Sequence, residues 1–99
     1  MRVHISEAAE RELDEIGTFI AKDNPERAVT FVIEIVEQCY ALAEHSQRYP
    51  IATDVKGLQL RRCPYRGHLI FYAITDRVEI AHVIHGARDY LKVLFPEEN

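Results

Sequence analysis

The chain has 99 residues, which is enough for one hydrophobic core, and we expect a single domain over residues 1–99. Hydrophobic residues make up 47% of the chain and charged residues 28%, and no apolar run approaches the roughly 20 residues of a membrane-spanning helix. A net charge of -4 argues against a general coating of nucleic acid, and acidic side chains from Glu7 onward argue against a secretory leader, so we expect a cytoplasmic protein.

The first half of the chain predicts a short strand and two antiparallel helices. Residues 2–5 alternate in the manner of a strand, and Ser6 can cap the helix that follows. Apolar residues then recur at steps of three and four up to Lys22. After a break, Asn24 can cap a second helix that starts at Pro25 and continues to Leu42. The short connection predicts a helical hairpin.

The second half predicts a sheet. We expect a loop over 45–56, with turn residues at Thr53-Asp54, and then three strands over 58–63, 69–74 and 78–84. Residues 87–95 are expected to form one or two helical turns, and 96–99 a frayed end. The order of these segments predicts an α+β domain with its helices on one face of the sheet.

Most sites with a known sequence pattern are absent. The four glycines are scattered, which excludes a phosphate-binding loop, and no serine lies in a nucleophile elbow. His82 and His85 would point to opposite faces of a strand, which disfavours zinc. Cys39 and Cys63 lie far apart in the sequence, and we expect reduced thiols. The sequence therefore predicts no metal and no cofactor.

One polar cluster remains in the second half of the chain. Its members are Arg61, Arg62, Tyr65, Arg66, His85, Arg88 and Tyr90. The first four lie at or before the turn at 64–67 and the last three follow the last predicted strand, at 85–90, so strand register decides whether these two groups meet. Such residues can hold a scissile phosphate, with histidine as base and arginine stabilising charge. The alternative is structural: Arg62 or Arg88 ties strand ends through Asp76 or Asp89, His82 is packed, and the other arginines pair with the acidic helices.

Three segments resemble the RelE/ParE superfamily of type II toxin–antitoxin toxins. They are ISEAAERELDEIGTFIAKDNPERAVTFV, LRRCPYRGHLIFYAI and VIHGARD, and together they cover nearly the whole chain. The resemblance implies an antiparallel α-helical hairpin packed on a mostly antiparallel β-sheet, which agrees with the order of segments predicted above. It also implies one of two activities: RelE-type toxins cut mRNA on the ribosome, whereas ParE-type toxins inhibit DNA gyrase.

The residues favour the ParE-like branch. RelE-type toxins carry lysines on the first strand of the hairpin, where this chain has Leu58, Gln59 and Leu60. They carry an arginine on the next strand, where this chain has Leu69, and often a tyrosine near Leu94, for which Tyr90 is a poor substitute. Only Arg88, after the last strand, matches. A nuclease without these cations would lose the groups that stabilise its transition state.

We therefore expect a ParE-like toxin that binds its target. The expected target-binding residues are Arg61, Arg62, Tyr65, Arg66, His85 and Arg88. The alternatives are a RelE-like ribonuclease that uses Arg62, His85 and Arg88, and a degenerate module that binds antitoxin without toxicity. The resemblance implies DNA gyrase or the ribosome as target, no membrane and no sequence-specific DNA binding by this chain. It also implies a cognate ParD/RelB-like antitoxin, for which Phe19, Val36 and Tyr40 are the expected apolar contacts.

Overall fold

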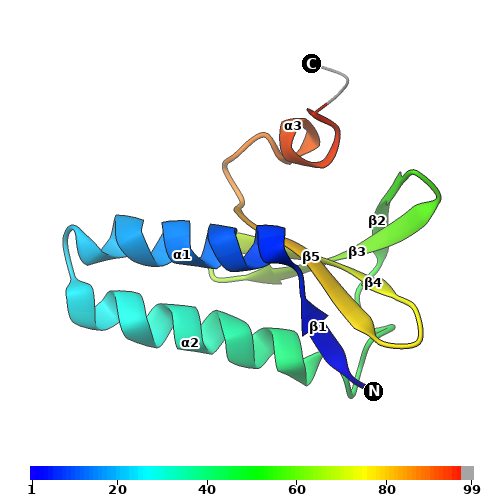
Figure 1. Ribbon diagram of the computed structural model, residues 1–99, viewed down its shortest axis with the longest axis horizontal. Helices are drawn as coiled ribbons and strands as arrows, with labels where there is room; N and C mark the ends of the chain where they lie inside the picture. The colour runs from blue at the N-terminus through cyan, green and yellow to red at the C-terminus, as the bar shows by residue number, and fades with distance from the viewer. Residues whose placement is uncertain (97–99) are drawn as a thin grey trace.

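The computed structural model describes residues 1–96 and shows a helical hairpin, a five-stranded sheet and a short C-terminal helix (Figure 1). The elements are β1 (Val3–Ile5), α1 (Glu7–Ala21), α2 (Pro25–Ala41), β2 (Ile51–Val55), β3 (Leu58–Tyr65), β4 (His68–Ile74), β5 (Val78–His85) and α3 (Tyr90–Leu94). The strand order is β1-β5-β4-β3-β2. Among the strands of the described residues, only the β1–β5 pair is parallel, so the predicted α+β fold with a mostly antiparallel sheet is confirmed.

The helical hairpin begins and turns where the sequence predicts. The Ser6 hydroxyl accepts a hydrogen bond from the Ala9 amide at 3.1 Å, and the Asn24 side chain accepts one from the Arg27 amide at 3.0 Å. Each cap satisfies an amide that the first turn of its helix leaves without a partner. Ser6 also donates to the carbonyl of Ala81 at 2.9 Å, which joins the start of α1 to β5.

The sheet is covered on both faces, by different helices. On one face, α1 and α2 bury Ile70, Tyr72 and Val83 in the main core. On the other face, Phe71 and Ile84 lie in a second cluster with Leu94 of α3. The prediction that all helices lie on one face is therefore wrong for α3. The reason is that β4 and β5 are apolar on both faces, so the second face also needs a cover.

The predicted loop over 45–56 contains an additional strand, β2. The chain reverses at Lys56 and Gly57, which have positive φ angles of 53° and 86°, and not at Thr53-Asp54. Both φ angles are those of a type I′ hairpin turn, whose twist matches that of paired strands. Asp54 supports this turn by accepting a hydrogen bond from the Gly57 amide at 2.8 Å.

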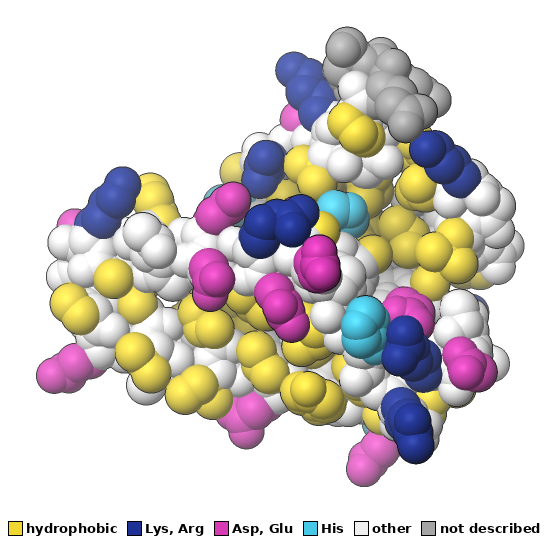
Figure 2. Space-filling model, viewed as in Figure 1, with side chains coloured by type: hydrophobic (Ala, Val, Ile, Leu, Met, Phe, Trp, Pro, Cys, Tyr) yellow, Lys and Arg dark blue, Asp and Glu magenta, His cyan; other side chains and the backbone are white. Residues whose placement is uncertain are grey.

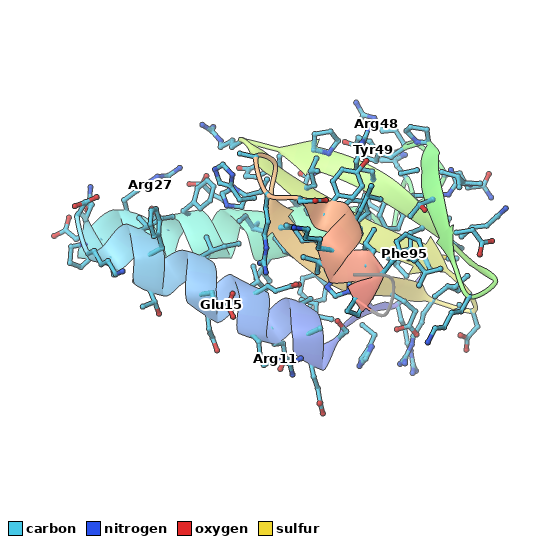
Figure 3. All side chains as sticks on the ribbon, turned by 90° about the horizontal axis from the view of Figure 1, so that it is seen from above. Arg11, Glu15, Arg27, Arg48, Tyr49 and Phe95 are labelled. Atoms are coloured by element: carbon cyan, nitrogen blue, oxygen red, sulfur yellow. The ribbon has the colours of Figure 1, made fainter. Side chains whose placement is uncertain are left out.

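The rest of that segment, before β2, is tied to the sheet. The Arg61 guanidinium donates to the carbonyl of Tyr49 at 2.6 Å, and the Tyr72 hydroxyl donates to that of Ser46 at 2.6 Å. Figure 3 shows Tyr49 beside the strands, and its ring packs against the main core. The segment over 45–50 is therefore an anchored connection.

Three further predictions concern the ends and the cysteines. The short C-terminal helix is confirmed, whereas the frayed end predicted for 96–99 lies, apart from Pro96, outside the described residues. Cys39 and Cys63 are buried and form no disulfide, and burial raises the pKa of the Cys39 thiol to about 12. Within residues 1–96, no helix has the length and apolar character to cross a membrane.

Candidate functional site

The two halves of the predicted polar cluster meet at one end of the sheet. Tyr65 of β3 pairs with His68 of β4, and His68 pairs with His85 of β5. The rings of His68 and His85 lie edge to face, with centroids 5.0 Å apart. Strand register thus brings the turn after β3 next to the segment after β5.

A hydrogen-bond network joins this end of the sheet to α2. Glu34 accepts hydrogen bonds from Arg27 at 2.6 Å and from the Tyr65 hydroxyl at 3.1 Å, and its carboxylate lies 3.7 Å from the Arg66 guanidinium. The hydrogen bond from Arg27 is the main reason why the pKa of Glu34 lies below its ordinary value. The Arg66 side chain remains 65% exposed, so it can still donate to a partner.

The segment after β5 is compact and presents Arg88. The Gly86 amide donates to the carbonyl of Gly67 at 2.7 Å, and the Arg88 amide donates to that of His85 at 3.0 Å. Asp89 caps α3 by accepting from the Leu91 amide, and over the described part of the chain no ion pair joins Asp89 or Asp76 to Arg88 or Arg62. The predicted tie between strand ends is therefore not found, and Arg88 is exposed.

Arg61 and Arg62 do not join this group. Arg61 pairs with Tyr72 in register and is half-buried, and it donates to the carbonyls of Tyr49 and Gln47. Arg62 pairs with Phe71, whose side chain belongs to the cluster on the α3 face. Neighbouring residues of a strand point to opposite faces, so the structure separates two arginines that the sequence places together.

An open, mostly apolar cavity of about 650 Å³ lies between the hairpin and the end of the sheet. Its lining comprises Glu12, Glu15, Ile16, Phe19, Ile20, Phe31, His68, Val83, Ile84, His85 and Arg88. Phe19 is 70% exposed, and Figure 3 shows Glu15 on the side of the hairpin opposite Arg27. Val36 and Tyr40 do not line the cavity, so the three expected antitoxin contacts do not lie in one groove.

His68 is the site residue that the sequence analysis missed. It is 9% exposed, and in the part of the chain that the structure describes its Nδ1 atom has no hydrogen-bond partner. Burial lowers the pKa of His68, and the neighbouring His85 lowers it further, whereas the Arg66 carbonyl acts in the opposite direction. A lowered pKa favours the neutral imidazole of His68. The signal in the sequence was its position: His68 follows a two-residue turn and so pairs with Tyr65.

The geometry does not assemble a catalytic centre from the predicted set. Arg62 lies toward the α3 face, whereas the His85 ring contacts His68 on the hairpin face. Across residues 1–96 there is no group of three or more histidine, cysteine or acidic side chains that could hold a metal ion. What the site offers is an apolar hollow with exposed hydrogen-bond donors beside it, which suits a macromolecular contact.

Known proteins share this sequence pattern and this fold. A family model described as "ParE toxin of type II toxin-antitoxin system, parDE" matches residues 3–90. The protein "Putative toxin Y4kP" from Sinorhizobium fredii (strain NBRC 101917 / NGR234) is 37% identical over 95 residues, which cover 94% of this chain and 96% of that protein. A solved structure titled "Chromosomal ParDE TA system from P. aeruginosa" superposes with a TM-score of 0.70 over 86% of this chain and 95% of that chain. At 20% identity, this last similarity concerns the fold alone.

Proposed function

Because the chain belongs to the ParE family of toxins from type II toxin–antitoxin systems, we propose that it inhibits DNA gyrase by binding and is neutralised by a cognate antitoxin. Both events would take place in the cytoplasm. The family match spans residues 3–90, which include the hairpin, the sheet and the segment that carries His85 and Arg88.

The observation that carries binding over RNA cleavage is the separation of Arg62 from His85. A nuclease that used Arg62, His85 and Arg88 would need all three around one phosphate, but Arg62 lies toward the opposite face of the sheet. Leu60 and Leu69, at positions where RelE-type toxins carry cations, pack in or against the cluster on that same face. A single preorganised donor is worth about 3 kcal/mol of transition-state stabilisation, so the missing groups would slow cleavage severely.

We place the target contact at the end of the sheet where Tyr65, Arg66, His85 and Arg88 meet. Arg66 and Arg88 are exposed, and their guanidinium groups can donate to carboxylates or phosphates of a large partner. Tyr65 and Glu34 hold the turn that presents Arg66. Arg61 has a structural role, because its Nη1 atom donates to the carbonyls of Gln47 and Tyr49 in the 45–50 segment.

We place the antitoxin contact at the cavity, where Phe19 offers an exposed aromatic ring beside Ile16 and Phe31. An amphipathic segment seated there would cover apolar surface that the isolated chain leaves in water. It would also lie against His85 and Arg88, so that antitoxin and target would compete for neighbouring residues. This arrangement would account for neutralisation by simple obstruction.

A supercoiling assay with purified gyrase tests the proposal. We expect the chain to inhibit supercoiling and excess antitoxin to restore the activity of gyrase. The Arg66→Ala and Arg88→Ala variants should each inhibit supercoiling at least about tenfold more weakly than the parent chain. Arg11→Ala removes an exposed arginine of α1 and serves as the matched control, with inhibition unchanged.

A parallel assay with translating ribosomes separates the alternatives. Intact mRNA beside inhibited gyrase supports the proposal, whereas cut mRNA with active gyrase supports a RelE-like ribonuclease. If neither target responds and cells grow normally when the chain is expressed without antitoxin, the chain is an antitoxin-binding module without toxicity.

A further inference from the structure

A row of exposed apolar side chains runs along the outer side of α2. Val29 is 61% exposed, Ile33 52% and Tyr40 54%, and the half-buried Val36 lies between the last two. Steps of four, three and four residues place all four on one side of a helix, over a length of about 16 Å. We call Val29, Ile33, Val36 and Tyr40 the α2 stripe. Figure 2 shows it as a row of yellow side chains over α2.

The α2 stripe is separate from the cavity. Of the α2 residues, only Phe31 lines the cavity, and none of the four stripe residues does. Phe31 and Ile33 are two positions apart, which turns them about 200° from each other around the helix axis. Phe31 is 7% exposed and packs in the core, whereas Ile33 points outward. The hairpin therefore has two unpartnered apolar surfaces on different sides.

Carboxylates border the α2 stripe along both of its edges. Glu26 and Glu37 of α2 lie at the turns next to Val29, Ile33 and Tyr40. On the other edge, α1 approaches so closely that a Cβ on Gly17 would lie 3.3 Å from Val32. Glu10 and Asp14 precede Gly17 by seven and three residues, which puts them on the same side of α1. Figure 2 shows acidic side chains over α1 beside the yellow row.

These four carboxylates are not neutralised within the described part of the chain. Glu10, Asp14, Glu26 and Glu37 are exposed, and no ion pair or hydrogen bond involves their side chains. Arg27 is held by Glu34 on another side of α2, where Figure 3 shows it pointing away from Arg11 and Glu15. The stripe is thus an apolar surface between two lines of negative charge.

We propose that the α2 stripe is a docking surface for a cationic amphipathic helix of another protein. Such a helix would place its apolar side on Val29, Ile33, Val36 and Tyr40 and its lysines or arginines beside the four carboxylates. Complementary charge at the rim of an interface raises the rate of association and excludes partners of the wrong sign. A second copy of this chain is a poor occupant, because acids would face acids along both edges. The proposal stands on the geometry of α2 and does not depend on gyrase as the target.

A designed peptide provides the probe. It has about 18 residues, or roughly five helical turns, with leucines at steps of four, three and four and lysines on either side. A control peptide keeps the leucines and carries glutamates in place of the lysines. Binding of both peptides to the full chain is followed by fluorescence anisotropy at low and high salt.

We expect the lysine peptide to bind saturably and the glutamate peptide to bind at least about tenfold more weakly. Ile33→Ser should weaken binding of the lysine peptide by about tenfold or more, as should the Glu26→Gln/Glu37→Gln double variant in low salt. Leu91→Ser, on α3 and outside both surfaces, should leave that binding unchanged, and Phe19→Ser tests the cavity as a competing site. Thermal melts of each variant confirm folding, since all the altered side chains are exposed.

Four results would overturn the proposal. The first is equal affinity of the two peptides, which would mean adhesion by apolar contact alone. The second is that Phe19→Ser loses binding whereas Ile33→Ser keeps it, which would move the contact to the cavity. The third is a concentration-dependent dimer of the chain that Ile33→Ser converts to a monomer, which would make a second copy the occupant. Absence of any binding would also refute it.

Discussion

Gly86 has no side chain because another stretch of backbone occupies the space. A Cβ built on Gly86 would lie 2.9 Å from the carbonyl oxygen of Gly67, the same oxygen that accepts a hydrogen bond from the Gly86 amide. We expect Gly86→Ala to lower the free energy of unfolding by about 1–3 kcal/mol, because the backbone must shift to relieve the overlap. Urea denaturation measures this loss. Ala87→Ser, at an exposed neighbour, is the control, and equal stability of the two variants would contradict the close contact.

His68 makes the fold sensitive to acid. The pKa of His68 is lower in the folded chain than in the unfolded chain. At pH values between these two pKa values, the unfolded chain therefore binds more protons than the folded chain does. The contribution of neutral His68 to stability is therefore present above the ordinary histidine value of about 6.5 and is lost as pH falls through the folded value. We expect His68→Gln to lose less melting temperature than the parent chain between pH 7.5 and pH 5.5, both values being chosen to bracket about 6.5.

The comparison of the two chains isolates His68 from the other titrating groups. His45→Gln, at an exposed position, should melt like the parent chain at both pH values. If His68→Gln and the parent chain lose the same melting temperature on acidification, the buried histidine does not carry the effect.

Between elements, Glu12 of α1 completes the open edge of β5. β1 pairs with β5 only up to Ile80, and beyond it Glu12 accepts a hydrogen bond from the Val83 amide at 3.0 Å and contacts His82 Nδ1 at 2.9 Å. We expect Glu12→Ala to lower the free energy of unfolding by about 1–3 kcal/mol, because the Val83 amide loses its acceptor at a buried residue. Glu12→Gln keeps an acceptor and should lose less.

Denaturant unfolding of matched variants checks this prediction. Glu15→Ala removes an exposed carboxylate of the same helix and controls for helix propensity and charge. A loss in Glu12→Ala no larger than that in Glu15→Ala would mean that water satisfies the Val83 amide.

Local signals predicted the helices well, whereas contacts between elements were harder to predict. Ser6, Asn24 and Pro25 act within their own turns, so the sequence alone identifies both helix starts. β2 escaped prediction because the turn was assigned to Thr53-Asp54, and Lys56-Gly57 is the weaker turn signal in the sequence. Gly57 nevertheless supplies one of the two positive φ angles of the actual turn. The face of the sheet that α3 covers could not be predicted, since the sequence of a five-residue helix does not indicate on which face it packs.

The candidate site was predicted in part, for a similar reason. Tyr65 and Arg66 meet His85 and Arg88 through strand pairing, which the sequence left open. Arg61 and Arg62 were grouped by charge, although adjacent residues of a strand necessarily point to opposite faces. His68 lies just before the predicted strand over 69–74, so only its place after the turn at 66–67 could have indicated its burial.

For the molecule as a whole, the exposed apolar surface of the hairpin predicts strong stabilisation by the antitoxin. A ligand that binds only the folded state, at one hundred times its dissociation constant, adds about 2.7 kcal/mol, or roughly 10–20 °C for a domain of this size. We expect the isolated chain to be poorly soluble, and its melting temperature to rise by this order with excess antitoxin. Differential scanning fluorimetry measures the shift.

Phe19→Ser should reduce that shift, because it removes the most exposed ring of the cavity. Leu91→Ser is the matched control, since Leu91 is 52% exposed on α3 and does not line the cavity. An unchanged melting temperature on adding antitoxin to the parent chain would contradict a contact at the hairpin.

The parallel pairing of β1 with β5 also bears on how the chain matures during its synthesis. The first strand can pair with β5 only after Val78–Ile80 have left the ribosome. Until then β2, β3 and β4 can pair with one another, but β5, the strand that joins them to β1, is missing together with His85 and Arg88. A product truncated before Val78 would lack both the partner of β1 and His85 and Arg88 of the proposed target contact, so prematurely terminated copies should be harmless to the cell that makes them.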